Sequence, residues 1–260
     1  MDLQLQDNTV VVVGGNSGIG RACTEAFAAE GAKVAVWDRQ ISDVQNTAGL
    51  SLKVDIVEQQ AIQQALATTE SSLGAVDHLV NAAAIGSGKV GRPFTNLETT
   101  DWAKVLDVNV NGMVNIAHVV APGMVDRQKG SFVFIASVAG QIGSPTDPPY
   151  SASKAANINF AQVMARDLAM HGVRVNTVCP GMVQTPLNRS VWEAGNQLLP
   201  PTERTTYDEW ADEKIRQLVP LNRWQRAADI ADMVVFLTSN RARQVTGQTI
   251  NVDGGYVMHS

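Results

Sequence analysis

A run of β-branched residues followed at once by a glycine-rich loop constrains the fold of this chain more than any other feature. Thr9–Val13 is typical of a strand that is buried on both faces. Gly14, Gly18 and Gly20 follow it, and residues 21–30 then show the apolar spacing of a helix. Gly14 permits a tight turn, Gly18 lets a phosphate approach the backbone, and Gly20 lets the helix and the strand pack closely. This order predicts a nucleotide-binding site at the N-terminus of the helix.

An acidic residue ends the second predicted strand. Residues 32–37 form this strand, and Asp38 follows 18 positions after Gly20. A carboxylate at this position accepts hydrogen bonds from both ribose hydroxyls and repels a 2′-phosphate, which favours NAD over NADP. Arg39 leaves the alternative open, because an arginine here is able to bind a 2′-phosphate.

Strands and helices continue to alternate along the rest of the chain. Further strands are expected at residues 52–54, 76–80, 173–178 and 249–252 and just before Ser137, and helices at residues 58–73, 101–118 and 229–237 and around Tyr150. This alternation predicts one α/β domain over residues 1–260, with a doubly wound parallel sheet covered by helices on both faces. Ligands bind such sheets at the carboxyl ends of the strands, where Asp55 and Asn81 fall.

Residues 185–218 break the alternation. They mix apolar side chains with Pro200-Pro201 and many polar residues. A long irregular insertion in a compact domain is usually functional or mobile. We expect a lid of short helices that binds substrate, with a contact between subunits as the alternative.

Tyr150 and Lys154 are candidates for acid–base chemistry. Residues four apart lie on the same face of a helix, and a nearby ammonium group favours the phenolate form of a tyrosine. With 3 Tyr and 20 Lys plus Arg in 260 residues, chance alone gives about 0.2 such pairs, so the pair gains its weight from its surroundings. Ser137 ends a buried strand upstream, and its hydroxyl is able to donate to a substrate oxygen.

Composition excludes several classes of partner. The formal net charge of −5 gives no reason to expect nucleic acid or an anionic membrane surface. No run of about 18 apolar residues is present, and residues 1–6 lack the features of a signal peptide. Cys23 and Cys179 fit reduced thiols in a cytoplasmic protein, and the 4 His have no zinc-site spacing, so we expect no metal.

The order of these motifs resembles the short-chain dehydrogenase/reductase family over essentially the whole chain. The resemblance implies a Rossmann-type fold and hydride transfer between a nicotinamide and an alcohol or carbonyl. The residues that carry it are Gly14, Gly18, Gly20, Asp38, Asn81, Ala82, Ala83, Asn109, Ser137, Tyr150, Lys154, Pro180, Gly181, Asp253, Gly254 and Gly255.

The resemblance also implies the roles of four catalytic residues. Tyr150 would be the general acid or base, and Ser137 would orient the substrate oxygen. Lys154 would hold the nicotinamide ribose and lower the pKa of the tyrosine. Asn109 would kink its helix and hold a water in a proton relay; an asparagine inside a helix is locally unfavourable, which itself suggests a function.

The resemblance implies a longer set of cofactor contacts and an assembly. Members are commonly tetramers built on the two long helices and the last strand. The expected cofactor-binding residues are Gly14, Asn16, Ser17, Gly18, Ile19, Gly20, Asp38, Arg39, Asp55, Ile56, Asn81, Ala82, Ala83, Tyr150, Lys154, Pro180, Gly181, Val183 and Thr185.

Three positions depart from the family pattern. Val13 replaces the usual Thr before the first glycine, and Ala136 replaces the usual Ser before Ser137. Ala84 replaces a glycine and cannot take every glycine backbone conformation, so the loop at this position is expected to sit differently.

These observations favour an NAD-dependent oxidoreductase that acts on a hydrophobic, cyclic secondary alcohol or ketone, for example a terpenoid alcohol such as borneol. The pocket is expected under the lid, and the resemblance implies that it lies beside Ile85, Ile142 and residues 145–149, which are mostly apolar. One alternative is an NADPH-dependent 3-oxoacyl-carrier-protein reductase. Another, from a different class, is a non-catalytic nucleotide-binding regulator.

Overall fold

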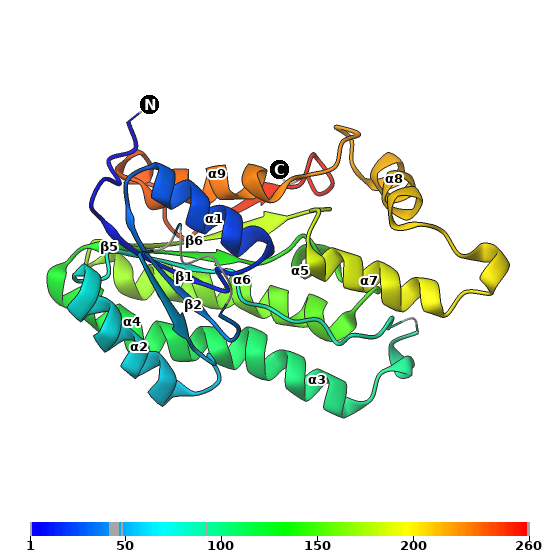
Figure 1. Cartoon of the computed structure of the whole chain (residues 1–260), viewed down its shortest axis with the longest axis horizontal. Coiled ribbons are helices and arrows are strands. Elements are labelled where there is room, and N and C mark those ends of the chain that lie inside the picture. Colours follow the sequence, from blue (N-terminus) through cyan, green and yellow to red (C-terminus); the bar gives the residue numbers. More distant parts are fainter. Residues whose placement is uncertain (1, 42–46, 48, 92, 259–260) are drawn as a thin grey trace.

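Within the residues that the computed structural model describes (2–41, 47, 49–91 and 93–258), seven parallel strands form one sheet in the order β3-β2-β1-β4-β5-β6-β7 (Figure 1). The strands are β1 Thr9–Val13, β2 Lys33–Asp38, β3 Leu50–Lys53, β4 His78–Asn81, β5 Gly130–Ile135, β6 Val173–Pro180 and β7 Thr249–Val252. Because β1 pairs with both β2 and β4, the strand order reverses beside β1. Ligands bind open α/β sheets outside such a reversal point.

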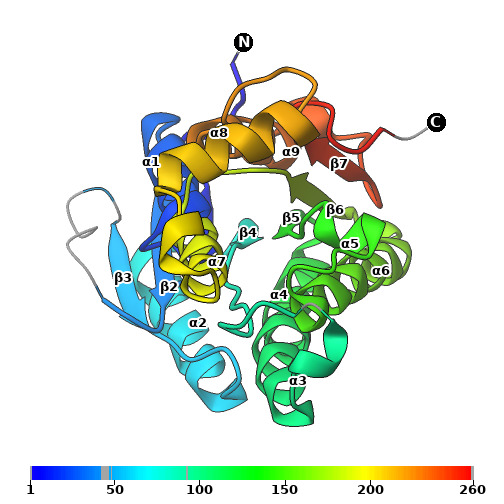
Figure 2. The ribbon, with the colours of Figure 1, turned by 90° about the vertical axis from the view of Figure 1, so that its right-hand side faces the viewer.

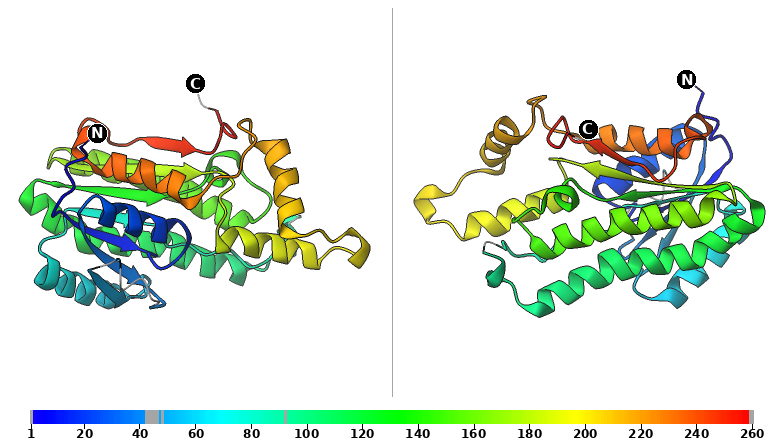
Figure 3. Two further views of the ribbon diagram at one scale, coloured as in Figure 1. Left: turned by 45° about the horizontal axis from the view of Figure 1, so that its top comes forward. Right: turned by 180° about the vertical axis from the view of Figure 1, so that it is seen from behind.

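Helices cover both faces of the sheet, as the alternation predicts. Helices α1 (Gly18–Ala29) and α9 (Ala227–Thr238) pack together on one face. Helices α2 (Gln59–Leu73), α4 (Gly112–Arg127) and α6 (Pro148–Ala169) cover the other, where the right-hand view of Figure 3 shows α6 running beside α3 and α4. The doubly wound fold predicted from the sequence is therefore confirmed.

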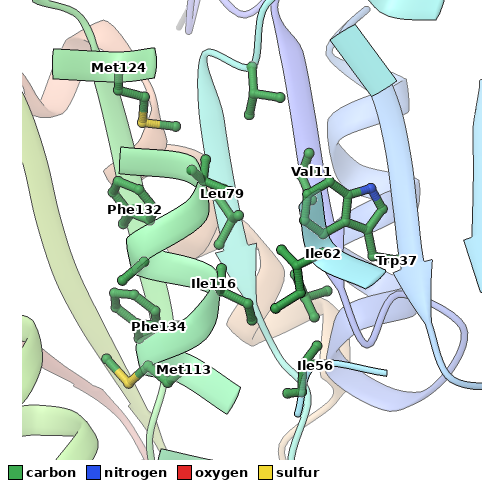
Figure 4. Close-up of a cluster of buried hydrophobic side chains, with 14 of the residues drawn as sticks. Val11, Trp37, Ile56, Ile62, Leu79, Met113, Ile116, Met124, Phe132 and Phe134 are labelled. Carbon is green, nitrogen blue, oxygen red and sulfur yellow. The ribbon is translucent and has the colours of Figure 1, made fainter. Parts of the chain in front are cut away.

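Alternate residues of the strands supply two hydrophobic clusters. Val11 and Val13 join the cluster under α2 and α4, whereas Val10 and Val12 join the cluster under α1 and α9. This division follows from the two-residue period of a strand, and it explains why four consecutive residues of β1, Val10–Val13, are apolar. Figure 4 shows Trp37 and other large side chains filling the first cluster.

Several element boundaries differ from the sequence prediction. Helix α1 begins at Gly18, three residues before the expected start. The single helix expected over residues 101–118 is wrong: α3 (Thr99–Leu106) and α4 are joined by a π-helical segment at Asp107–Asn111. A short helix, α5 (Ala139–Ile142), was not expected. A four-residue helix cannot show a hydrophobic period, so its sequence carries no clear signal.

The predicted lid consists of two helices, α7 (Pro186–Gln197) and α8 (Tyr207–Leu218), which Figure 2 shows in front of the sheet. A bridge between Val183 and Gln225 holds the two ends of the lid side by side. The ring of Tyr207 packs against Trp192, Trp210 and Trp224, and the Arg189 guanidinium lies 4.4 Å from its centroid. These aromatic contacts give the lid a small core of its own.

Helices long and apolar enough to cross a bilayer are absent from the described residues.

Candidate active site

A cavity of about 310 Å³ lies at the carboxyl ends of β1, β2 and β3. Its walls come from the glycine loop, from the strand ends at Asp38 and Asp55, and from the start of the lid. Twelve of the residues predicted to bind the cofactor line it: Gly14, Ser17, Gly18, Ile19, Gly20, Asp38, Arg39, Asp55, Ile56, Ala82, Ala83 and Thr185.

Two glycines of the loop stand where no larger residue fits. Gly14 has a φ of +75°, and a Cβ there would lie 2.8 Å from the backbone nitrogen of Ala83. A Cβ on Gly20 would lie 2.1 Å from the carbonyl oxygen of Gly14. Gly20 therefore lets α1 approach β1 closely, as predicted, and Gly14 lets the loop pack on the segment after β4.

The carboxylate of Asp38 connects the second strand to the glycine loop. Its Oδ2 accepts a hydrogen bond from the Asn16 N–H at 3.1 Å, and its Oδ1 accepts one from the Gln40 N–H at 3.0 Å. An ionised carboxylate has about four acceptor positions, so each oxygen keeps capacity for a further donor. Asp38 thus faces the cavity as a negative group that is able to accept two hydroxyls.

Two predicted cofactor residues do not line either cavity. The Asn16 side chain donates to the Gln40 carbonyl and closes the rim between loop and strand. Asn81 is buried, and its side chain accepts a hydrogen bond from the Ala83 N–H at 3.2 Å. In this structure both asparagines shape the walls of the site.

A second cavity, of about 250 Å³, adjoins the first and holds three of the predicted catalytic residues, Ser137, Tyr150 and Lys154. Pro180, Gly181 and Val183 also line it. The two cavities lie side by side, because five residues line both: Ile19, Ala82, Ala84, Thr185 and Leu187. Tyr150 and Lys154 come from α6, whereas Ser137 follows β5, so the fold brings together residues that lie 13 or more positions apart.

Electrostatics at the tyrosine differ from the sequence expectation. Burial raises the pKa of Tyr150 to about 12, although a hydrogen bond with Ser137 acts in the opposite direction. Burial lowers the pKa of Lys154 to about 8. The Lys154 ammonium lies 5.5 Å from the centre of the tyrosine ring and donates to the Ile135 carbonyl at 2.7 Å. The pKa of Tyr150 lies above its ordinary value and not below it, because burial disfavours the phenolate more than the Ser137 hydrogen bond favours it.

Asn109 lies in the π-helical segment and ties three parts of the site together. Its side-chain amide donates to the Ile85 carbonyl and accepts from the Ile85 N–H, both at 2.9 Å. The same amide donates to Ser153 on α6 at 2.9 Å. The main-chain carbonyl of Asn109 accepts from Asn157 at 2.7 Å and has a second lone pair for a water.

The three departures from the family pattern fit without strain. Val13 and Ala136 are buried among apolar residues. Ala84 lines both cavities, and it is not among the non-glycine residues with a positive φ. A glycine is therefore not required at this position.

The second cavity is lined mostly by apolar groups, as expected, but not by the residues that the sequence suggested. Ile142 is 44% exposed and lies outside its lining, and Ile85 lines the first cavity only. Residues 145–149 contribute the polar side chains Thr146 and Asp147. The residues expected to make this pocket apolar are therefore wrong: residues 145–149 contribute polar side chains, and Leu187, Val191 and Leu218 are among the apolar residues of the lining.

Sequence reasoning also missed the residues that the lid contributes. Trp210, Lys214 and Leu218 line the second cavity from α8. They recur every four residues and share one face of the helix, while Tyr207, Ala211 and Ile215 are buried on another. This spacing is the signal that identifies them.

A family model described as enoyl-(acyl carrier protein) reductase matches residues 13–257. The chain belongs to the short-chain dehydrogenase/reductase family, and it is an oxidoreductase of the kind that uses a nicotinamide cofactor.

Similar proteins span the whole chain. The 3-oxoacyl-(acyl-carrier-protein) reductase FabG of Thermotoga maritima is 32% identical over 98% of this chain and 100% of its own length. The 2-(S)-hydroxypropyl-CoM dehydrogenase 3 of Xanthobacter autotrophicus is 34% identical over 98% of each chain. The crystal structure of levodione reductase superposes with a TM-score of 0.88 at 27% identity, over 97% of this chain and 98% of that one.

Proposed function

We propose that this protein interconverts a secondary alcohol and its ketone with NAD as the hydride acceptor or donor. The observation that carries the reaction type is the convergence of Ser137, Tyr150 and Lys154 on one cavity that adjoins the glycine-loop cavity. The relatives support it, since their names describe reductases of carbonyl compounds and a dehydrogenase of a hydroxy compound.

The first cavity fits a dinucleotide. The loop from Gly14 to Gly20 and the N-terminus of α1 would hold the phosphates, and Asp38 would hold the adenosine ribose. Asp55 and Ile56 would contact the adenine, and Thr185 and Val183 the carboxamide. The negative charge of Asp38 supports NAD: two unit charges about 4 Å apart at a protein surface repel by about 4 kcal/mol, which disfavours a 2′-phosphate.

The side chains of the second cavity would handle the proton. The nicotinamide, when bound, supplies the site of hydride transfer. The Tyr150 phenol would exchange a proton with the substrate oxygen, and the Ser137 hydroxyl would donate a hydrogen bond to the same oxygen. The Lys154 ammonium would favour the phenolate during alcohol oxidation. Asn109 would keep the loop at Ile85 and helix α6 in register.

The body of the substrate would lie under the lid. Leu187, Val191, Trp210 and Leu218 form an apolar wall from α7 and α8, which suits a cyclic or otherwise bulky alcohol. A terpenoid alcohol such as borneol would fit this wall, but no relative reported above is named for a terpenoid, so the apolar wall is its only support.

A second candidate is an NADPH-dependent 3-oxoacyl-carrier-protein reductase. It is favoured by the 32% identity to the Thermotoga maritima enzyme over the full length of both chains. Arg39 lines the first cavity and would have to bind the 2′-phosphate. We rank this candidate second because Asp38 faces the same space.

We further propose a cytoplasmic homotetramer. The two cysteines are free and buried, which suits a reducing compartment. Helix α6 exposes Val163, and the residue that follows its end, Met170, is also exposed; a subunit interface would cover both apolar side chains.

Cofactor choice is tested by steady-state kinetics with NAD and NADP. We expect the wild type to favour NAD by about 100-fold in kcat/KM, because Asp38 repels the 2′-phosphate. Asp38→Asn keeps the shape and removes the charge, so the preference should fall to about tenfold or less, mainly through a gain with NADP. Asp55→Asn is the matched control in the same cavity and should weaken both cofactors alike. A wild type that prefers NADP and reduces 3-oxoacyl thioesters would contradict the proposal and support the second candidate.

A further inference from the structure

Asp147 is a buried carboxylate in the second cavity for which the acid–base chemistry above has no use. It lies at the N-cap position of α6, one helical turn before Tyr150, and only 9% of it is exposed. It lines the same cavity as Ser137, Tyr150 and Lys154. Burial raises the pKa of Asp147, and the negative charge of Asp147 contributes to the raised pKa of Tyr150.

The sequence after Asp147 limits the usual role of an acid at this position. An N-cap carboxylate normally accepts hydrogen bonds from the N–H groups of the second or third helical residue. Here Pro148 and Pro149 occupy the first two helical positions and carry no N–H. Tyr150 occupies the third helical position. Its N–H acts to lower the pKa of the Asp147 carboxylate, but it does not form a cap hydrogen bond with it.

The carboxylate turns instead toward the loop after β4. Its Oδ2 accepts a hydrogen bond from the Ser87 N–H at 2.8 Å, and a Cβ on Gly86 would lie 2.7 Å from that oxygen. The other oxygen, Oδ1, is buried and has no hydrogen-bond partner. Among the described residues, the ion pairs involve other acids, so no cation neutralises Asp147.

A buried carboxylate oxygen without a partner is costly, and such a group in a binding cavity indicates a missing donor. We propose that Asp147 is a specificity-determining residue, which accepts a hydrogen bond from a second hydroxyl of the substrate, two or three bonds from the reacting carbon. The substrate is then a diol or a hydroxyketone with one polar edge toward α6 and an apolar body toward the lid. This inference rests on the proposed function and narrows its substrate class.

The test compares two alcohols that differ by one hydroxyl, trans-cyclohexane-1,2-diol and cyclohexanol, with NAD as the oxidant. We expect the wild type to favour the diol by about 10- to 100-fold in kcat/KM, the range for a hydrogen bond to a charged group. Asp147→Leu should lose this preference, because kcat/KM should fall more with the diol than with cyclohexanol. Asp147→Asn keeps an acceptor oxygen and should retain part of the preference for the diol. This variant also keeps the test possible if the leucine variant does not fold.

Thr146→Val is the matched control, because Thr146 lines the same cavity and the change conserves shape. It should change kcat/KM for both alcohols by the same factor. Equal use of the two alcohols by the wild type, or an equal loss of both in Asp147→Leu, would overturn the inference and leave the proposed function intact. Absence of NAD reduction with both alcohols, together with NADPH-driven reduction of a 3-oxoacyl thioester, would overturn the proposed function and the inference with it.

Discussion

At neutral pH the phenol of Tyr150 is protonated and the amine of Lys154 is largely charged, because burial raises the first pKa to about 12 and lowers the second to about 8. When two titrating groups are neighbours, the apparent pKa of each deprotonation step describes the pair and not one residue. The first proton leaves near pH 8. After this loss the pair exists in two forms, a phenolate beside an ammonium and a phenol beside a neutral amine. The two forms carry the same number of protons, so their ratio does not change with pH. The phenolate form accepts the alcohol proton, so a fixed fraction of the singly deprotonated pair is reactive in alcohol oxidation.

This coupling predicts the pH dependence in both directions. Below pH 8, kcat/KM for alcohol oxidation should rise about tenfold per pH unit and then level off near pH 8. Ketone reduction needs both protons, so its kcat/KM should be level below pH 8 and fall above it. In Lys154→Met the break in the pH profile near pH 8 should disappear. Its kcat/KM for alcohol oxidation should keep rising to pH 10, because Tyr150 then titrates alone near pH 12. A break at pH 8 that survives in this variant would contradict the assignment.

At the scale of the element, the π-helical segment between α3 and α4 depends on contacts that are not evident from the residues of the segment alone. The sequence identifies Asn109 as an unfavourable helix residue, but a helical period of 3.6 residues does not predict a π turn. That turn depends on distant partners, because Asn109 bonds the backbone of Ile85 and the side chain of Ser153. Local patterns therefore predicted the helices and their order. They did not predict the π-helical turn, because it depends on contacts that form only in the folded protein.

Loss of the hydrogen bonds between Asn109 and Ile85 should be measurable as a loss of stability. Asn109→Ala leaves the partly buried N–H and C=O of Ile85 without these partners, which should lower the free energy of unfolding by about 2–4 kcal/mol and reduce kcat/KM. Asn111→Ala is the matched control on the same segment, since Asn111 is exposed and bonds only Asp107; it should change stability by less than about 0.5 kcal/mol. Urea unfolding checks both. Equal effects of the two variants would show that Asn109 has no special role.

At the scale of the molecule, the sequence predicted the parallel sheet, its two helical layers and the short helices within residues 185–218. The alternation of valine-rich strands and helices is a local signal that repeats along the whole chain. The site was predicted in part: the glycine loop, Asp38, Ser137, Tyr150 and Lys154 line two adjoining cavities. The orientation of Asp147 and the inward face of α8 were missed, because both depend on how loops after different strands pack together.

The most direct test of the account is NAD reduction by the purified protein with a panel of secondary alcohols, run beside Tyr150→Phe. We expect activity with NAD in the wild type and a loss of about 10²- to 10⁴-fold in kcat in the variant, the usual contribution of a general acid or base, with NADH binding unchanged. Full activity of Tyr150→Phe would contradict the proposed chemistry, and so would NADH binding by a wild type that oxidises no alcohol and reduces no ketone.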